Sequence, residues 1–128
     1  MWTLVVFLLT GISRIRAVRG RRVSPRAFLY GESAEVPPDV SLPNRNLMNL
    51  LEAPVLFYVA CLGFYTIHHV TRGVVTLAWV YVGLRLAHSL IHLTTNRIPH
   101  RLLAFAASNF VLVALWMLVG IALARGAG

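Results

Sequence analysis

The sequence predicts an all-α integral membrane protein whose four helices form an up-down bundle. Hydrophobic residues make up 58% of the 128 residues. Charged residues make up only 12%, whereas a soluble domain carries about 25%. Four long apolar runs follow one another, separated by polar segments that contain Gly, Pro or Asn. These observations predict a single transmembrane domain over residues 1–128.

The first apolar run predicts a span at about residues 2–16. Its continuous apolar part ends at Ile12 and covers roughly 16–20 Å, whereas the hydrocarbon core of a bilayer is about 30 Å thick. We therefore expect either that the helix continues past Arg14 inside a protein bundle, or that Met1 is not the true start. A signal peptide is not favoured, because no basic segment precedes the run and no small-residue cleavage site follows it.

Residues 17–43 are predicted to form a cytoplasmic loop, punctuated by Gly and Pro. The net charge is +8, and all twelve Lys or Arg positions are arginine. Half of these arginines lie in this loop and at the end of the first span, which is typical of a cytoplasmic side. No soluble portion is large enough to present a basic nucleic-acid surface, so we expect no nucleic-acid partner. The clustered arginines are Arg14, Arg16, Arg19, Arg21, Arg22 and Arg26.

Three further spans are predicted at about residues 47–67, 74–95 and 101–124. Asn44 is typical of a helix start before the second span, and Pro99 of the first turn of the fourth. Short turns make successive helices antiparallel, so the first and third loops share one side of the membrane. These loops hold most of the arginines, which predicts that they are cytoplasmic and that both termini lie outside. The use of Arg without Lys, together with much Ala, Val and Leu, indicates a GC-rich bacterial genome, and we therefore expect the protein in a bacterial inner membrane.

Ionisable side chains inside the third span predict a site. Arg85, His88 and His92 are separated by three and four residues, so they share one face of a helix. Ionisable groups at bilayer depth are costly, and they usually face a protein interior or a functional cavity. We therefore expect this face to be buried and to line a binding site.

A second polar face lies on the second span, which carries Arg45, Asn49 and Glu52 at helical spacing. Because the two spans run in opposite directions, both faces reach a similar depth, roughly 6–17 Å from the cytoplasmic side. We expect Glu52 to pair with His88 or Arg85. A pocket with many fixed cations and one carboxylate suits a small ligand with several carboxylates and an amine. The arginines expected at its mouth are Arg14, Arg45, Arg97 and Arg101.

These patterns resemble the MAPEG family, the membrane-associated proteins of eicosanoid and glutathione metabolism. The resemblance covers nearly the whole chain and lies in the joint spacing of polar and charged residues. It is nearest to the branch of the microsomal prostaglandin E synthase. The positions that carry it are TGISRIR at Thr10–Arg16, Arg45-x3-Asn49-x2-Glu52 followed by Pro54, and Arg85-x2-His88-x3-His92 followed by Pro99 and Arg101.

The resemblance implies four transmembrane helices per subunit, a homotrimer, and glutathione bound as co-substrate between subunits near the cytosolic side. Glutathione has two carboxylates, an ammonium group and a thiol, which agrees with the expected pocket. Arg101 would face the sulfur, where an arginine at a helix N-terminus stabilises a thiolate. The tripeptide would be held by Arg14, Arg45, Asn49, Glu52, His88 and His92, and the other candidate binding residues of the pocket are Arg85 and Arg97.

Three positions depart from the family pattern. His92 stands where active members commonly have Tyr. Leu102 and Phe105 stand where the prostaglandin-forming branch has Ser and Tyr. Hydroxyl donors near the sulfur are therefore missing or replaced, and thiolate stabilisation would depend mainly on Arg101.

Two classes of function follow. The leading hypothesis is a glutathione-dependent enzyme that transfers glutathione to a lipophilic electrophile or reduces a lipid hydroperoxide. The alternative is a non-catalytic membrane protein of the same fold that binds a lipid or a partner. In that case Arg85 and Glu52 form a structural pair, and Arg101 is a headgroup anchor. A zinc site at His88 and His92 is not favoured, because no third ligand is evident beyond Glu52.

Overall fold

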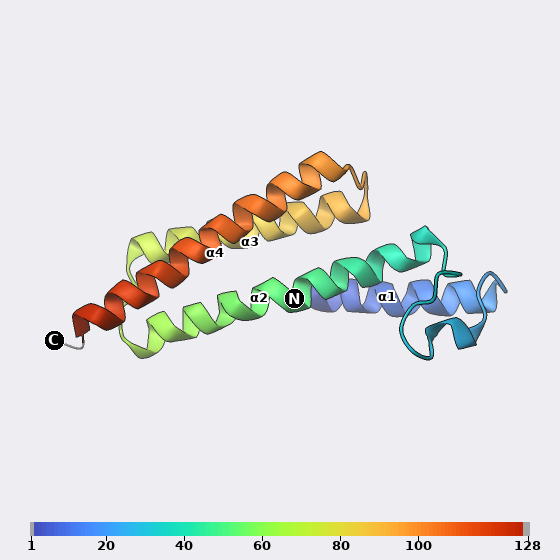
Figure 1. Ribbon diagram of the computed structural model, residues 1–128, viewed down its shortest axis with the longest axis horizontal. Helices are drawn as coiled ribbons and strands as arrows, with labels where there is room; N and C mark the ends of the chain where they lie inside the picture. The colour runs from blue at the N-terminus through green and yellow to red at the C-terminus, as the bar shows by residue number, and fades with distance from the viewer. Residues whose placement is uncertain (1, 127–128) are drawn as a thin grey trace. The chain divides into compact units, whose positions relative to one another are not determined.

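The computed structural model describes residues 2–126 (Figure 1). Its elements are α1 (Trp2–Arg19), the 3-10 helix η1 (Pro25–Phe28), α2 (Pro38–Thr66), α3 (Arg72–Leu93) and α4 (Ile98–Gly126). No β-strand occurs within the described residues. Three of the helices, α2, α3 and α4, are long and apolar enough to cross a membrane. The predicted all-α fold with four helices is confirmed, and the chain is an integral membrane protein.

The first helix is longer than its apolar run. α1 continues past Arg14 and ends at Arg19, in agreement with one of the two expectations for this span. Its second half carries three arginines, so α1 is not among the helices whose composition suffices for crossing a bilayer. The Thr10 hydroxyl, which is buried, donates to the Val6 carbonyl at 2.9 Å. This bond satisfies the hydroxyl within the helix.

The second helix begins earlier than expected. α2 starts at Pro38, so the expected loop 17–43 is too long and Asn44 lies inside the helix. Proline suits the first helical position because it has no N–H to leave unpaired there. Asp39 in the first turn interacts favourably with the positive end of the helix dipole. These two signals outweigh Asn44 as the helix start.

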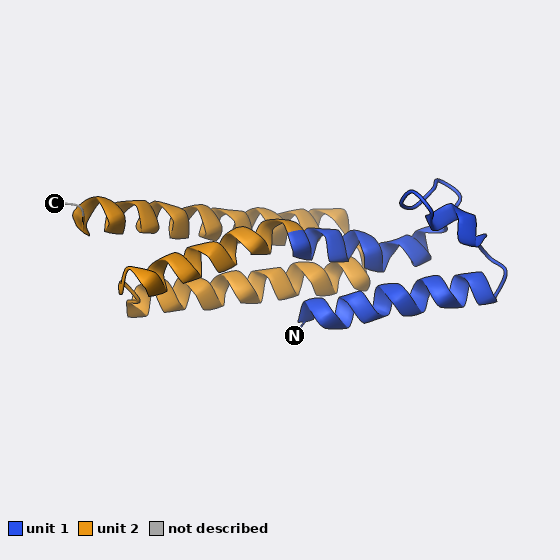
Figure 2. Cartoon of the chain, turned by 90° about the horizontal axis from the view of Figure 1, so that it is seen from below, with its two compact units in different colours: residues 1–51 blue, residues 52–128 orange. Residues whose placement is uncertain are grey.

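Residues 1–51 form the first of two compact units, shown in blue in Figure 2. The 3-10 helix η1 is capped by Ser24, whose Oγ accepts from the Arg26 N–H at 3.3 Å. Both terminal nitrogens of Arg22 bond to the Asp39 carboxylate, at 2.9 and 3.0 Å. This ion pair ties the loop to the first turn of α2. The buried apolar core of the unit consists of Ala17, Val23, Ala27, Val36 and Val40.

The second unit begins at Glu52 and contains the rest of α2 together with α3 and α4, shown in orange in Figure 2. The short connection between Leu93 and Ile98 makes α3 and α4 antiparallel, and the two helices lie side by side. The rings of Phe57 and Tyr81 stack with centroids 4.4 Å apart and planes inclined by 18°. The buried core consists of Phe57, Ala60, Phe64, Val74, Tyr81, Leu112, Leu115 and Val119.

Large apolar side chains also cover the outside of this unit. Trp79, Leu103 and Phe110 are 71%, 72% and 77% exposed. Helices that are apolar both inside and outside suit a lipid surrounding rather than water. The packing of the second unit therefore agrees with its membrane-spanning composition.

Candidate functional site

The turn between α3 and α4 brings polar side chains of both helices together. α3 ends at Leu93, and both the hydroxyl and the N–H of Thr94 bond to the Leu90 carbonyl. Asn96 adopts a left-handed φ of 45°, which Asn tolerates better than most residues. Its N–H donates to the Ile91 carbonyl at 2.7 Å. This turn closes the end of α3 and leads directly into α4.

Arg101, in the first turns of α4, is the centre of the cluster. Its Nη1 donates to Oδ1 of Asn96 at 3.0 Å and to Nδ1 of His92 at 3.3 Å. Because a guanidinium donates and cannot accept, Nδ1 of His92 must carry a lone pair, and this ring is neutral. Both partners of Nη1 are therefore uncharged. Within residues 2–126 no carboxylate forms an ion pair with Arg101, so its positive charge is not neutralised.

His88 is bonded to the backbone of the same residue. Its Nδ1 lies 3.0 Å from the Arg101 carbonyl, and a carbonyl only accepts, so Nδ1 carries the hydrogen. In the neutral ring, Nε2 is then an acceptor. His88 is 3% exposed, and Nε2 is buried without a hydrogen-bond partner among residues 2–126. A buried acceptor without a partner is costly, which indicates a position where a ligand donor can bind.

The ring of Phe105 packs against Arg85 and His88 of this cluster. The Arg85 guanidinium carbon lies 5.7 Å from the centroid of the Phe105 ring, within cation–π distance. The His88 ring lies 5.6 Å from the same ring. Arg85 is 4% exposed and interacts electrostatically with the exposed carboxylate of Glu52. The expected stripe of Arg85, His88 and His92 is therefore a buried face of α3.

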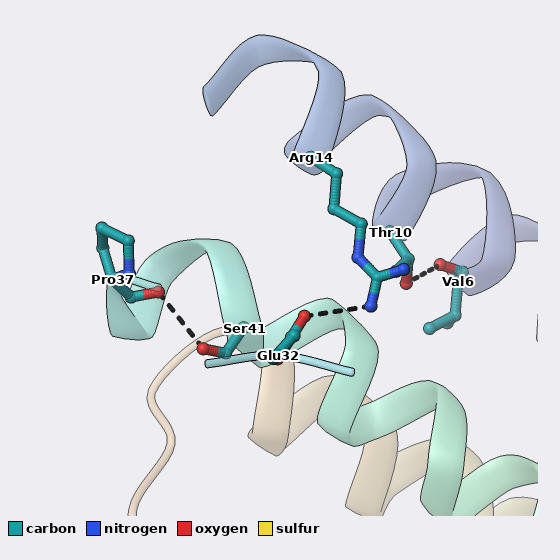
Figure 3. A network of polar contacts seen from close by, with 6 residues as sticks. All are labelled: Val6, Thr10, Arg14, Glu32, Pro37 and Ser41. Atoms are coloured by element: carbon teal, nitrogen blue, oxygen red, sulfur yellow. Dashed lines mark hydrogen bonds and ion pairs between the residues drawn. The ribbon is translucent and has the colours of Figure 1, made fainter. Parts of the chain in front are cut away.

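The residues from the first unit are engaged differently. Arg14 forms an ion pair with Glu32 at 3.2 Å, drawn in Figure 3, and its guanidinium carbon lies 5.2 Å from the centroid of the Phe28 ring. Figure 3 also shows Ser41 donating to the Pro37 carbonyl, at 3.2 Å, near the start of α2. The Arg14–Glu32 pair joins α1 to the loop, and the Ser41–Pro37 bond is local to the start of α2. Arg14 is thus already paired with a carboxylate.

Arg45 and Asn49 also lie in the first unit. Arg45 is exposed, and Nδ2 of Asn49 donates to the Arg45 carbonyl at 3.0 Å. Arg97 is exposed at the turn before α4, and its carbonyl accepts from the Arg101 N–H at 3.0 Å. The described contacts group Arg85, His88, His92 and Arg101 into one cluster. The shared pocket that would add Arg14, Arg45 and Asn49 stays a prediction.

Three residues that contact the candidate site residues were not themselves predicted from the sequence. Asn96 holds Arg101, Phe105 packs on Arg85 and His88, and Glu32 neutralises Arg14. An Asn placed between a helix end and a helix-starting proline is a signal for a left-handed turn residue. That signal locates Asn96 but does not reveal its side-chain partner.

The histidines are arranged for hydrogen bonding. Their ring centroids are 6.1 Å apart, and Nδ1 of each ring is engaged with Arg101. Among residues 2–126, no group of three or more His, Cys, Asp or Glu side chains could hold a metal ion. The cluster therefore offers an anion-binding guanidinium and an acceptor nitrogen.

Comparison with known proteins identifies the family of the chain. No curated protein and no solved structure matches the chain. The model of the MAPEG family matches residues 1–121, which is nearly the whole chain. A match of this extent includes α1, α2, α3, most of α4 and every residue of the Arg101 cluster. The chain therefore belongs to the MAPEG family.

Proposed function

We propose that this protein is a glutathione-dependent membrane enzyme. It transfers glutathione to a lipophilic electrophile, or reduces a lipid hydroperoxide, with Arg101 stabilising the glutathione thiolate. The observation that carries the proposal is the hydrogen bonding of Arg101, whose guanidinium at the start of α4 is held by two uncharged acceptors, Asn96 and His92. Membership of the MAPEG family, which includes glutathione-dependent enzymes and non-catalytic proteins, supports the choice of ligand.

The proposed chemistry needs a thiolate near neutral pH. A free thiol has a pKa of about 8.5, and a neighbouring cation at a helix N-terminus lowers it. Because the partners of Arg101 are neutral, its charge stays available for the sulfur. In the transfer reaction the thiolate forms a carbon–sulfur bond, and the leaving group or a proton-accepting carbon takes up the displaced electron pair.

The rest of the tripeptide would be held by groups of complementary charge. His88 Nε2 is a buried acceptor that suits the ammonium group, and the buried cation of Arg85 suits a carboxylate. The further binding residues in this proposal are Arg14, Arg45, Asn49, Glu52, His92 and Arg97. The lipophilic substrate would enter from the bilayer between the helices.

The proposal includes the assembly and the orientation of the protein. The site would be shared between subunits of a homotrimer, and the member would be nearest to the prostaglandin E synthase-like branch of the family. The arginine-rich loop after α1 and the turn before α4 would face the cytoplasm of a bacterium, with the protein in the inner membrane and both termini outside. A detergent-corrected mass equal to one subunit would contradict the trimer.

The test uses the purified protein in detergent. Millimolar glutathione is expected to raise the thermal unfolding midpoint and to produce the ultraviolet absorption band of a bound thiolate. S-methylglutathione, which lacks an ionisable thiol, is the matched control and is expected to raise the midpoint without the band. Absence of both effects with glutathione would overturn the enzyme proposal.

The alternative is a non-catalytic member of the family that binds a lipid or a partner protein. The observation that favours it is the replacement of hydroxyl residues near Arg101, where the chain has Leu102 and Phe105. In that case Arg101→Ala leaves glutathione binding and absorption unchanged, because Arg101 then contacts lipid headgroups rather than the glutathione sulfur.

A further inference from the structure

Asn96 connects the end of α3 to the guanidinium of Arg101. Its backbone N–H is bonded to Ile91 in α3, and its side-chain Oδ1 accepts from Arg101 in α4. We propose that Asn96 is a positioning residue that aims the Arg101 guanidinium, so that a defined edge faces the ligand. This inference rests on the proposed function for the identity of the ligand, but not for the geometry.

The hydrogen bonds determine which edge that is. A guanidinium has five N–H groups, and the two on Nη1 are both used, one by Asn96 and one by His92. The donors of Nε and Nη2 have no partner among residues 2–126, and they point along a different edge of the planar group. This edge forms a fork of the kind that binds planar anions such as carboxylates. Asn96 therefore selects the binding edge rather than contributing to it.

The choice of residue type at this position has a physical reason. The backbone φ of 45° favours Gly, Asn or Asp. Gly would adopt the turn but would leave one Nη1 hydrogen without an acceptor. Asp would keep the acceptor but would add a negative charge that offsets the charge of Arg101. Asn combines the turn, the acceptor and neutrality.

Three variants give separable results. Asn96→Gly keeps the turn and removes the acceptor, and Asn96→Asp keeps both but adds charge. His68, with a φ of 53° in the turn between α2 and α3, provides the matched control His68→Gly. This control also replaces a turn residue of left-handed φ by Gly, but it lies at the opposite end of α3 from Asn96 and Arg101.

The first measurement does not depend on glutathione. The rate at which phenylglyoxal modifies Arg101 is followed by mass spectrometry in the detergent-purified protein, together with the thermal unfolding midpoint. Asn96→Gly is expected to accelerate modification several-fold, because the guanidinium loses a holding bond, whereas Asn96→Asp and His68→Gly are expected not to accelerate it. An unchanged rate in Asn96→Gly would overturn the proposal.

The second measurement is the pH midpoint of the thiolate band of bound glutathione. A neighbouring charge shifts a pKa by roughly 1–3 units, so a misplaced guanidinium in Asn96→Gly is expected to raise the midpoint by about one unit. Asn96→Asp is expected to raise it also, although Arg101 stays in place. His68→Gly is expected to leave it unchanged. If no variant and not even the original protein shows the band, the proposed function fails, and the phenylglyoxal rates still decide the role of Asn96.

Discussion

The two compact units use arginine in opposite ways. In the first unit, Arg14 and Arg22 are each paired with a carboxylate, Glu32 and Asp39. Bonding to Asp39, and then its charge, raise the pKa of Arg22 above its ordinary value. In the second unit, Arg101 is held by an amide and a neutral imidazole. A carboxylate partner neutralises the charge of an arginine in a structural ion pair. A neutral acceptor fixes the position of the guanidinium and leaves its charge available to a ligand.

The largest expected effect tests the charge of Arg101 directly. Arg101→Ala is expected to remove the thiolate band and to lower kcat/KM by roughly 100- to 1,000-fold, which is typical of losing one donor that stabilises the reacting anion. Steady-state kinetics with a lipophilic electrophile and glutathione measure this loss.

The matched control for this change is Arg22→Ala, in the first unit. Because Arg22 is exposed and paired with Asp39, its loss is expected to leave kcat/KM unchanged. If both variants lose activity equally, the distinction between carboxylate-held and neutrally held arginines carries no functional meaning.

A smaller effect is expected at His88, where two ring nitrogens have different roles. Nδ1 donates to the Arg101 carbonyl, and Nε2 is a buried acceptor without a partner among residues 2–126. In His88→Asn, the amide nitrogen can replace the Nδ1 donor, but the Nε2 acceptor is lost. We expect the Kd for glutathione to rise about tenfold, the loss of one charge-assisted hydrogen bond, with little change in thermal stability.

His88→Leu removes both bonds and is expected to lower the thermal midpoint as well. Titration calorimetry and thermal unfolding together separate the two variants. Equal affinity in His88→Asn and the original protein would remove Nε2 from the proposed binding site.

The sequence predicts the second unit better than the first. The stripe of Arg85, His88 and His92 follows from helical spacing and from the cost of ionisable groups in lipid, and both are local properties. The sequence places the start of α2 wrongly at Asn44, because Pro38 and Asp39, a short distance earlier, are the start signals that the helix uses.

The partners of the arginines were harder to predict than their positions. Glu32 is separated from Arg14 by 18 residues, and no periodic pattern connects a loop carboxylate to a particular arginine. Asn96 could be recognised as a turn residue, but its bond to Arg101 depends on the direction in which α4 leaves the turn. Such contacts are tertiary. A single sequence shows residue types that can form them, but it does not show which residues are partners.

A smaller effect is expected from the Arg14–Glu32 ion pair of the first unit. Glu32→Gln removes the charge that neutralises Arg14 but keeps a side chain of the same shape. If Arg14 also holds a glutathione carboxylate, as proposed, the freed cation is expected to lower the Kd about two- to threefold, because partly exposed charge pairs contribute little. Titration calorimetry at two salt concentrations measures the change, which is expected to shrink at the higher one. An increase in Kd would mean that the Arg14–Glu32 pair must stay intact for binding.

The smallest effect is expected for the pair between Arg22 and Asp39. Its side chains are 52% and 62% exposed, so water and salt screen the interaction. The bond geometry is nevertheless bidentate, and it joins the loop to the first turn of α2. Asp39→Asn is therefore expected to leave glutathione binding and the thermal midpoint unchanged within error, while limited proteolysis within residues 20–37 becomes faster. Protection equal to that of the original protein would show that the apolar core around Val36 and Val40 holds the loop without the ion pair.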